Sequence, residues 1–272
     1  MRMESTKSNI TLLAISAAVF SHAQTKGDAG QITGLVFGDL YDVSSHHDPA
    51  IKGMNGIWIR RINLTYDKKL EERFSMRLRL EANSPGDFKS DTTMQPFFKD
   101  VSLQYNGQNN LKVLIGLIPT PTFSWLEETL GYRPVEKTPL DLYKMAESRD
   151  QGIAIKGTDA SQRLSFHLMY GNGSGVKGRS DKGNVFYGSV NYKLSPELTV
   201  EGYSDFWKKG DGSHWRTVSA SLVFKGRGVT AGLTLANQKR DHMTSSPDID
   251  IGLSSIYLDY QLNQTIKPFV RV

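Results

Sequence analysis

The sequence contains no cysteine among its 272 residues. Disulfide bonds, thiolate metal sites and a thiolate nucleophile are therefore excluded. It also lacks long apolar runs. Beyond the first two dozen residues, no segment reaches the roughly 20 apolar residues that a membrane-spanning helix needs. With 38% hydrophobic residues and a mean hydropathy of −0.39, the chain is long enough for a large core but is not a helical membrane protein.

The sequence also lacks a large excess of charge of either sign. Its 33 basic and 28 acidic residues give a net charge of +5. This mildly basic balance says little about partners. Arg60 and Arg61 are adjacent, but in an extended strand they would point to opposite faces and form no basic patch. No nucleic-acid partner is expected.

The N-terminus has the pattern of a secretory signal peptide. Arg2 and Lys7 precede the apolar run ITLLAISAAVF, and Ser21 and Ala23 place small residues at the −3 and −1 positions of a cut before Gln24. We expect residues 1–23 to be the signal peptide and residues 24–272 to be the mature domain. A membrane anchor would need a longer apolar run.

From Gln31 onward the chain repeats one pattern, in which a run of about ten residues alternates with period two and then breaks. This pattern predicts β-strands with one apolar and one polar face. No amphipathic helix is expected between them. The expected strands are Gln31–Val43, Ile57–Asp67, Phe74–Asn83, Phe97–Tyr105, Leu111–Ile118, Gln151–Gly157, Leu164–Gly171, Asn184–Leu194, Leu198–Trp207, Arg216–Phe224, Val229–Gln238 and Ile249–Leu262, with a thirteenth starting at Ile266.

The connections between these strands alternate strictly between long and short. An outer-membrane barrel sorts its loops in this way, with short periplasmic turns and longer extracellular loops, whereas a Greek-key sandwich has no reason to do so. Aromatic residues near the strand ends fit the girdles of such a barrel. The sequence therefore predicts an all-β fold, a transmembrane antiparallel up-and-down β-barrel in the outer membrane of a Gram-negative bacterium, with membrane lipid as a partner.

Several segments resemble one family of Gram-negative porins, the phosphate-selective porins O and P. They are LRLEANS at 78–84, PFFKDVSLQY at 96–105, PTPTFSWLEETLGYRPVEKTPLDL at 119–142, SRDQGI at 148–153 and FGDLYDV in the first strand. The resemblance implies a homotrimer of 16-stranded barrels with a constricting third loop. It does not by itself imply phosphate, because the family includes porins of unknown substrate.

The end of the chain departs from this pattern. Such barrels finish on an aromatic residue, whereas this sequence stops at IKPFVRV, just inside its thirteenth strand. An unpaired strand edge in lipid is costly. We therefore expect a barrel of about 16 strands when complete, with about 12 to 13 present and the C-terminal strands missing. A smaller complete barrel is the alternative.

Candidate pore-lining residues follow when the apolar phase of each strand is taken to face lipid. The inward charges are then Arg61, Arg77, Arg79, Lys112 and Lys156 against Glu81, Asp100, Glu201, Asp205 and Asp259. Five charges oppose five, which argues against a strongly anion-specific channel. The basic residues lie on the earlier strands and most of the acidic ones on later strands. We therefore expect a transverse electric field across the pore.

Residues 119–149 form the third long loop, and loops of this length are commonly functional. The loop contributes Glu127, Glu128, Arg133 and Asp141. We expect it to fold inward as a constriction, with its acids facing Arg61, Arg77 and Arg79. The alternative is a solvated extracellular loop.

The predicted function is passive diffusion of small hydrophilic solutes through a water-filled channel that leans toward small anions such as phosphate. A surface adhesin, another binding protein or a lipase is the alternative. No enzymatic activity, catalytic residue, metal site or cofactor is expected: adjacent His46 and His47 suit a metal poorly, and Ser165 and His167 have no acidic partner in the sequence pattern.

Overall fold

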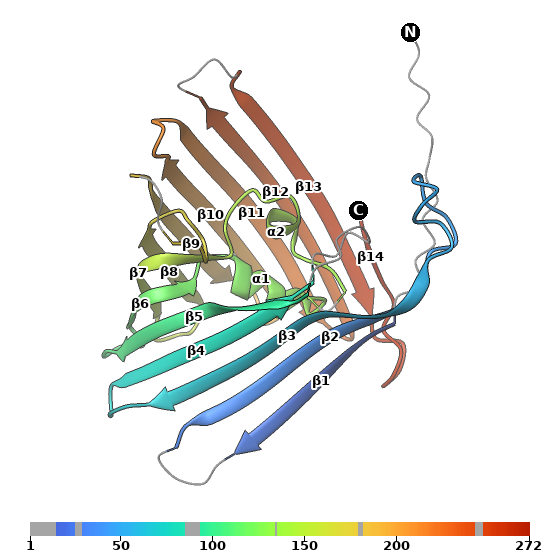
Figure 1. The fold of residues 1–272 in the computed structure, drawn as a ribbon. Coiled ribbons are helices and arrows are strands. Elements are labelled where there is room, and N and C mark those ends of the chain that lie inside the picture. The colour runs from blue at the N-terminus through green and yellow to red at the C-terminus, as the bar shows by residue number, and fades with distance from the viewer. Residues whose placement is uncertain (1–14, 25–28, 85–92, 134, 179–181, 243–246) are drawn as a thin grey trace. The chain divides into compact units, whose positions relative to one another are not determined.

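The computed structural model describes residues 15–24, 29–84, 93–133, 135–178, 182–242 and 247–272. Within these residues the chain forms 14 strands and two short helices (Figure 1). The elements are β1 (Ile15–Gln24), β2 (Gln31–Asp42), β3 (Asn55–Lys69), β4 (Phe74–Asn83), β5 (Gln95–Asn106), β6 (Lys112–Pro119), α1 (Phe123–Leu130), α2 (Pro139–Leu142), β7 (Arg149–Thr158), β8 (Leu164–Gly171), β9 (Asn184–Lys193), β10 (Leu198–Lys208), β11 (His214–Gly226), β12 (Val229–Asp241), β13 (Ile249–Tyr260) and β14 (Phe269–Arg271).

The sheet follows the chain, because the strands are hydrogen-bonded in sequence order from β1 to β14. The pairs with a recorded register are antiparallel throughout. The strands expected from Gln31 onward correspond to β2–β14, so the all-β, up-and-down antiparallel fold is confirmed. A complete barrel of about 16 strands remains a prediction.

Contacts divide the chain into two units, each of which is described by itself. The first unit is Met1–Lys68 with Leu78–Phe98, and the second is Lys69–Arg77 with Lys99–Val272. Residues 1–14 of the predicted signal peptide lie outside the described residues. Its remainder is part of β1, which pairs with β2 from Ile15↔Leu40 to Gln24↔Gln31. The signal peptide stays a prediction.

In the second unit, alternate residues of a strand are buried and exposed, but the buried phase is polar and the exposed phase is apolar. On β11, Thr217, Ser219 and Ser221 are buried, whereas the alternate Val218 and Leu222 are 45% and 39% exposed. A soluble sheet would turn its apolar face inward, because burial of apolar area stabilises the fold. A covered polar face and an exposed apolar face are what a barrel wall in lipid requires.

The first unit corrects the predicted phase of β2. The apolar phase of this strand contains Leu35, Phe37, Tyr41 and Val43 and was therefore expected to face lipid. Phe37 is instead buried at 4% exposure, while Ile32 and Leu40 of the other phase are 45% and 52% exposed. Phe37 pairs with Arg61 across to β3 and lies under its guanidinium at 5.9 Å. The even-numbered residues of β2 therefore form its exposed face.

A β-bulge corrects the prediction for Arg60 and Arg61. The register between β2 and β3 shifts after Phe37↔Arg61 to Gly38↔Ile59, so Arg60 is the extra residue. Such a residue resets the alternation of its strand. As a result Ile59 and Ile62 are both exposed, while both arginines are partly buried and paired with acids, and they do not split across the two faces.

The two helices in residues 119–149 correct the expectation that none occurs between the strands. In α1, Phe123, Leu126 and Leu130 recur at helical spacing and are the buried residues, and Gly131 ends the helix in a left-handed conformation at φ 76°. In α2, Pro139 occupies the first turn, where its missing N–H costs nothing. Neither of these helices, nor any other in the described part of the chain, has the length and apolar character for crossing a membrane.

Candidate functional site

Residues 119–149, called the third loop below, pack against the covered face of the sheet in the second unit. Leu126 and Leu130 of α1 form an apolar cluster with Val223 of β11 and Tyr257 of β13, and all four side chains are at most 8% exposed. Val223 continues the phase that carries the buried serines and threonine of β11. The loop therefore covers the polar phase of these strands.

A second apolar cluster holds the two ends of the loop. It includes Phe123, Leu140 and Met145 of the loop, packed with Tyr187 of β9 and Tyr203 of β10. Phe123 and Met145 are each 1% exposed. Burying side chains of this size stabilises the loop position by about 2 kcal/mol each.

Polar contacts fix the same loop. Thr122 donates a hydrogen bond from Oγ1 to Oε2 of buried Glu201 at 2.5 Å, and Thr217 donates to the carbonyl of Met145 at 3.1 Å. Gln238 donates to that same carbonyl and to Thr217. Because an unpaired buried polar group costs about 1–3 kcal/mol, these bonds favour one loop conformation.

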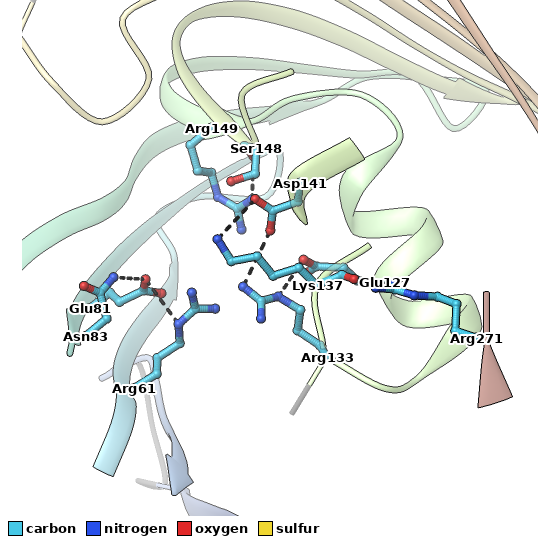
Figure 2. Close-up of polar contacts among 10 residues, drawn as sticks. All are labelled: Arg61, Glu81, Asn83, Glu127, Arg133, Lys137, Asp141, Ser148, Arg149 and Arg271. Atoms are coloured by element: carbon cyan, nitrogen blue, oxygen red, sulfur yellow. Dashed lines mark hydrogen bonds and ion pairs between the residues drawn. The ribbon is translucent and has the colours of Figure 1, made fainter. Parts of the chain in front are cut away.

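The charges of the loop pair largely with one another. Arg133 Nε lies 2.8 Å from Glu127 and its Nη2 lies 3.7 Å from Asp141. Figure 2 draws both contacts. Lys137 lies 3.6 Å from Asp141. Arg271 pairs with Glu136 of the loop. Two acids expected at a constriction thus have cationic partners within the loop, whereas Glu128 is exposed.

The point where the loop returns to the sheet is electrostatically distinct. Arg149 Nε donates to Asp100 of β5 at 2.6 Å, and Asp100 is fully buried. Two residues before Arg149, burial raises the pKa of the Glu147 carboxyl, and the negative charge of Asp150 raises it further. Burial also raises the pKa of Tyr132 in the same loop. The loop therefore has a neutralised anchor and an adjacent group that resists ionisation.

In the first unit, the expected arginines lie among acids and hydroxyls. Arg61 Nε lies 3.4 Å from Glu81, which also accepts from Asn83 at 3.2 Å (Figure 2). Arg60 pairs with Asp39 at 3.0 Å. These side chains form a row of ion pairs across β2, β3 and β4. Of this row, the sequence predicted only Arg61 and Glu81 as pore-lining residues.

Two more of the predicted cations, Arg77 and Arg79, belong to different units. Arg79, in the first unit, donates to Thr65 Oγ1 at 2.9 Å. Arg77, in the second unit, lies within electrostatic range of Lys156, as do Lys112 and Arg149 and one acid, Glu128. In the register of β6 and β7, Lys112 lies directly opposite Lys156. The cations of the second unit therefore gather along neighbouring strands.

Sequence reasoning left Arg60, Arg149, Thr122 and His167 out of the candidate site. Arg60 was hidden by the bulge, which no local pattern reveals. Arg149 is the last residue of the loop and the first residue of β7, a position that could have suggested an anchor. Thr122 and His167 gain their surroundings from contacts with distant strands. Among the described residues, no group of three or more His, Asp or Glu side chains is arranged to hold a metal ion.

The fold is that of the outer-membrane porins. The chain is similar to the solved structure of an anion-selective porin from Comamonas acidovorans, with a TM-score of 0.66 and 14% sequence identity, over 88% of this chain and 76% of that one. This confirms the outer-membrane barrel as the fold class and the Gram-negative outer membrane as the location typical of that fold. At this identity, the likeness shows the fold alone.

A second likeness is to OmpT, an outer membrane protein of Vibrio cholerae. Its loop L8 deletion mutant matches with 12% identity over 90% of this chain and 93% of that one, at a TM-score of 0.46. A structure described as the trimer form matches at 11% identity, over 90% and 88%, at a TM-score of 0.43. No family model matches the chain, and no curated protein matches it.

These comparisons correct one expectation from the sequence, namely that the protein is not an enzyme. The OmpT structures are described as outer membrane proteins and their descriptions name no channel. No activity follows from structures that match at 11–13% identity with TM-scores below 0.5, so the expectation that the protein is not an enzyme is not retained.

Proposed function

We propose that the protein is an outer-membrane porin that forms a water-filled channel for passive diffusion of small hydrophilic solutes, with a lean toward small anions. The observation that carries this proposal is the third loop, which packs on the polar phase of β10–β13 while the alternate phase of the same strands is apolar and exposed. A wall with one apolar and one polar face suits lipid on one side and water on the other. A loop on the polar side suits a constriction.

The family, the assembly and the solutes are part of the same proposal. The segments that resemble the porins O and P support membership in that group, and the resemblance supports a homotrimer. The solved anion-selective porin of similar fold supports an anion lean. The exposed apolar face supplies contacts for membrane lipid or for a neighbouring subunit.

We place the channel lining at the charged residues of the strands and the third loop. The set is Arg61, Arg77, Arg79, Glu81, Asp100, Lys112, Glu127, Glu128, Arg133, Asp141 and Lys156. These residues contribute unequally to the electric field in the channel, because some of them are paired with an opposite charge. Arg61 and Glu81 offset each other, as do Arg133 and Asp141, so their pairs contribute little net field at a distance.

Lys112 and Lys156 differ from these pairs. In the described ranges of the chain, neither ammonium forms an ion pair or a hydrogen bond. Two cations on the polar face without a directly paired acid attract anions, since a one-sign excess at a pore wall sets selectivity. They support the anion lean better than the arginines of the first unit do.

Planar-bilayer recording of the purified protein tests the proposal. Stepwise currents of porin size are expected, with a reversal potential in a potassium chloride gradient that indicates anion preference. A complete absence of current from folded protein would overturn the channel and leave surface binding as the function. Changing Arg77 and Arg79 together to Gln should move the reversal potential toward cations. An unchanged potential would remove these two arginines from the constriction.

A further inference from the structure

A cavity of about 250 Å³ lies within the second unit, between the first part of the third loop and the covered face of β6–β9. Its lining is polar or basic apart from one tryptophan, one phenylalanine and one glycine. The lining residues are Asn110, Lys112, Thr120, Thr122, Ser124, Trp125, Lys156, Gly157, Thr158, Ser165, Phe166, His167, Ser189 and Asn191. No carboxylate is among them.

A row of cationic and polar side chains crosses four strands at this cavity. Lys112 lies opposite Lys156, Lys156 opposite His167, and His167 opposite Ser189 in the registers of β6 to β9. Directly opposed residues place their Cβ atoms about 4.5–5.5 Å apart. The two ammonium groups and the imidazole are therefore near enough to share one small ligand.

Some of these groups have polar atoms with no partner. His167 Nε2 is buried and makes no hydrogen bond. In the part of the chain that the structure describes, neither lysine is ion-paired. Burying polar atoms unpaired costs free energy. The acid that acts electrostatically on Lys156 is Glu128, which is exposed on α1 and does not line the cavity. A ligand that accepts hydrogen bonds and carries negative charge would compensate this row.

The size of the cavity and its aromatic wall define the ligand further. About 250 Å³ is the share of roughly eight waters at about 30 Å³ each, which is more than a bare inorganic oxyanion fills. Trp125 of α1, partly buried, offers an apolar surface beside the hydroxyls of Thr122 and Ser124. An aromatic surface favours a ligand with a flat carbon skeleton.

We propose that this cavity is a binding subsite for small organic carboxylates, with the carboxylate at Lys112, Lys156 and His167 and the carbon skeleton against Trp125. This rests on the proposed channel function and deepens it, because it assigns the anion lean to a site beneath the third loop and names a substrate class. Ammonium–carboxylate hydrogen bonds are about twice as strong as neutral ones. The negative charge of the ligand therefore contributes more to its binding than the shape of its carbon skeleton.

Isothermal titration calorimetry of the folded protein in detergent tests the subsite with benzoate as the probe. Benzoate should bind, and inorganic phosphate should bind at least about tenfold more weakly because it lacks the apolar body. The double variant Lys112→Gln with Lys156→Gln should weaken benzoate binding at least about tenfold, since it removes two charge-assisted partners. Lys193→Gln, an exposed lysine outside the cavity, is the matched control and should change affinity less than about twofold.

The outcomes separate the subsite from the channel. Unchanged benzoate affinity in the double variant, verified as folded by far-UV circular dichroism, would overturn the subsite. Phosphate binding as tight as benzoate would overturn the organic class. His167→Gln and Trp125→Phe keep the packing and should each weaken benzoate. Binding without channel currents would refute the proposed function alone, whereas currents without binding would refute the subsite alone.

Discussion

Arg61 and Glu81 form an ion pair between neighbouring strands, with Arg61 Nε 3.4 Å from Glu81 Oε1. Their exposures differ, since the arginine side chain is 14% exposed and the carboxylate only 2%. The arginine also has a second contact, because its guanidinium lies over the ring of Phe37. We therefore expect the loss of the arginine and the loss of the acid to lower the free energy of unfolding by different amounts.

Removing the arginine should destabilise the protein more than removing the acid. Arg61→Gln removes one cation from a carboxylate that is only 2% exposed, which costs roughly 3 kcal/mol of unfolding free energy. Glu81→Gln leaves a less buried arginine that keeps Phe37, so its cost should be smaller. Urea unfolding followed by tryptophan fluorescence measures both. The double variant should lose less than the sum of the single variants, and simple additivity would contradict the pairing.

The same pair should tune ion selectivity. Glu81→Gln removes one negative charge beside Arg61 and should move the reversal potential toward anions, while Arg61→Gln removes one positive charge and should move it toward cations. The double variant should return close to the original value. Equal reversal potentials in all four proteins would mean that the pair does not line the pore.

The position of the third loop should depend on the buried face of α1. Leu126→Ala removes a side chain that is 2% exposed and should cost about 3 kcal/mol of packing energy. A loosened loop should give larger and noisier single-channel currents and faster tryptic cleavage within residues 119–149. Glu128→Ala, on the exposed face of the same helix, is the control and should leave loop cleavage unchanged. Equal cleavage rates in the two variants would contradict the packing role of Leu126.

Glu147 should give stability a pH dependence of definite sign. Its pKa in the folded protein is raised above the ordinary value of 4.5 by burial and by Asp150. Below pH 4.5 the carboxyl is neutral in both states and there is no penalty. As the pH rises above 4.5, ionisation favours the unfolded state more, and the penalty is complete above the raised pKa. Glu147→Gln should therefore stabilise the protein at neutral pH and not at pH 3.5, as measured by urea unfolding.

Asp159 provides the opposite case for comparison. Its hydrogen bond from Ser161, with backbone donors from Leu164 and Arg163, lowers its pKa below the ordinary value of 3.8. The ionised form therefore stabilises the fold above pH 3.8, and this contribution is lost as the pH falls through the lowered pKa. Asp159→Asn should destabilise at neutral pH and have little effect at low pH. Changes of the same sign in Asp159→Asn and Glu147→Gln would contradict the assignment of their environments.

Gly116 in β6 should resist any side chain. Its φ is 126°, and a Cβ built there would lie 2.1 Å from the carbonyl oxygen of Val101. Gly116→Ala should cost at least about 2 kcal/mol, because both the backbone conformation and the neighbouring strand oppose it. Gly202 in β10 has no atom within 4 Å of such a Cβ, so Gly202→Ala should be tolerated. The yield of heat-stable folded protein on semi-native gels measures the difference, and equal yields would refute it.

Local pattern alone located the strands, since period-two alternation is a property of consecutive residues. Every run predicted from Gln31 to Leu262 corresponds to an observed strand, and the second unit buries the polar phase that the sequence assigned to Glu201, Asp205 and Asp259. The length of the third loop was equally plain. The two helices in this loop were missed, because eight and four residues are too few to identify as helices without the surface on which they pack.

Only the tertiary structure decided which charges remain uncompensated. The bulge at Arg60 depends on the register with β2, and the pairing of Arg61 with Glu81 and of Arg149 with Asp100 depends on strands that meet across long sequence separations. A sequence lists charges one strand at a time, whereas an electrostatic field depends on distances between strands. The sequence thus determined a two-faced sheet with a long third loop, and strand pairing brought Lys112, Lys156 and His167 together along one row.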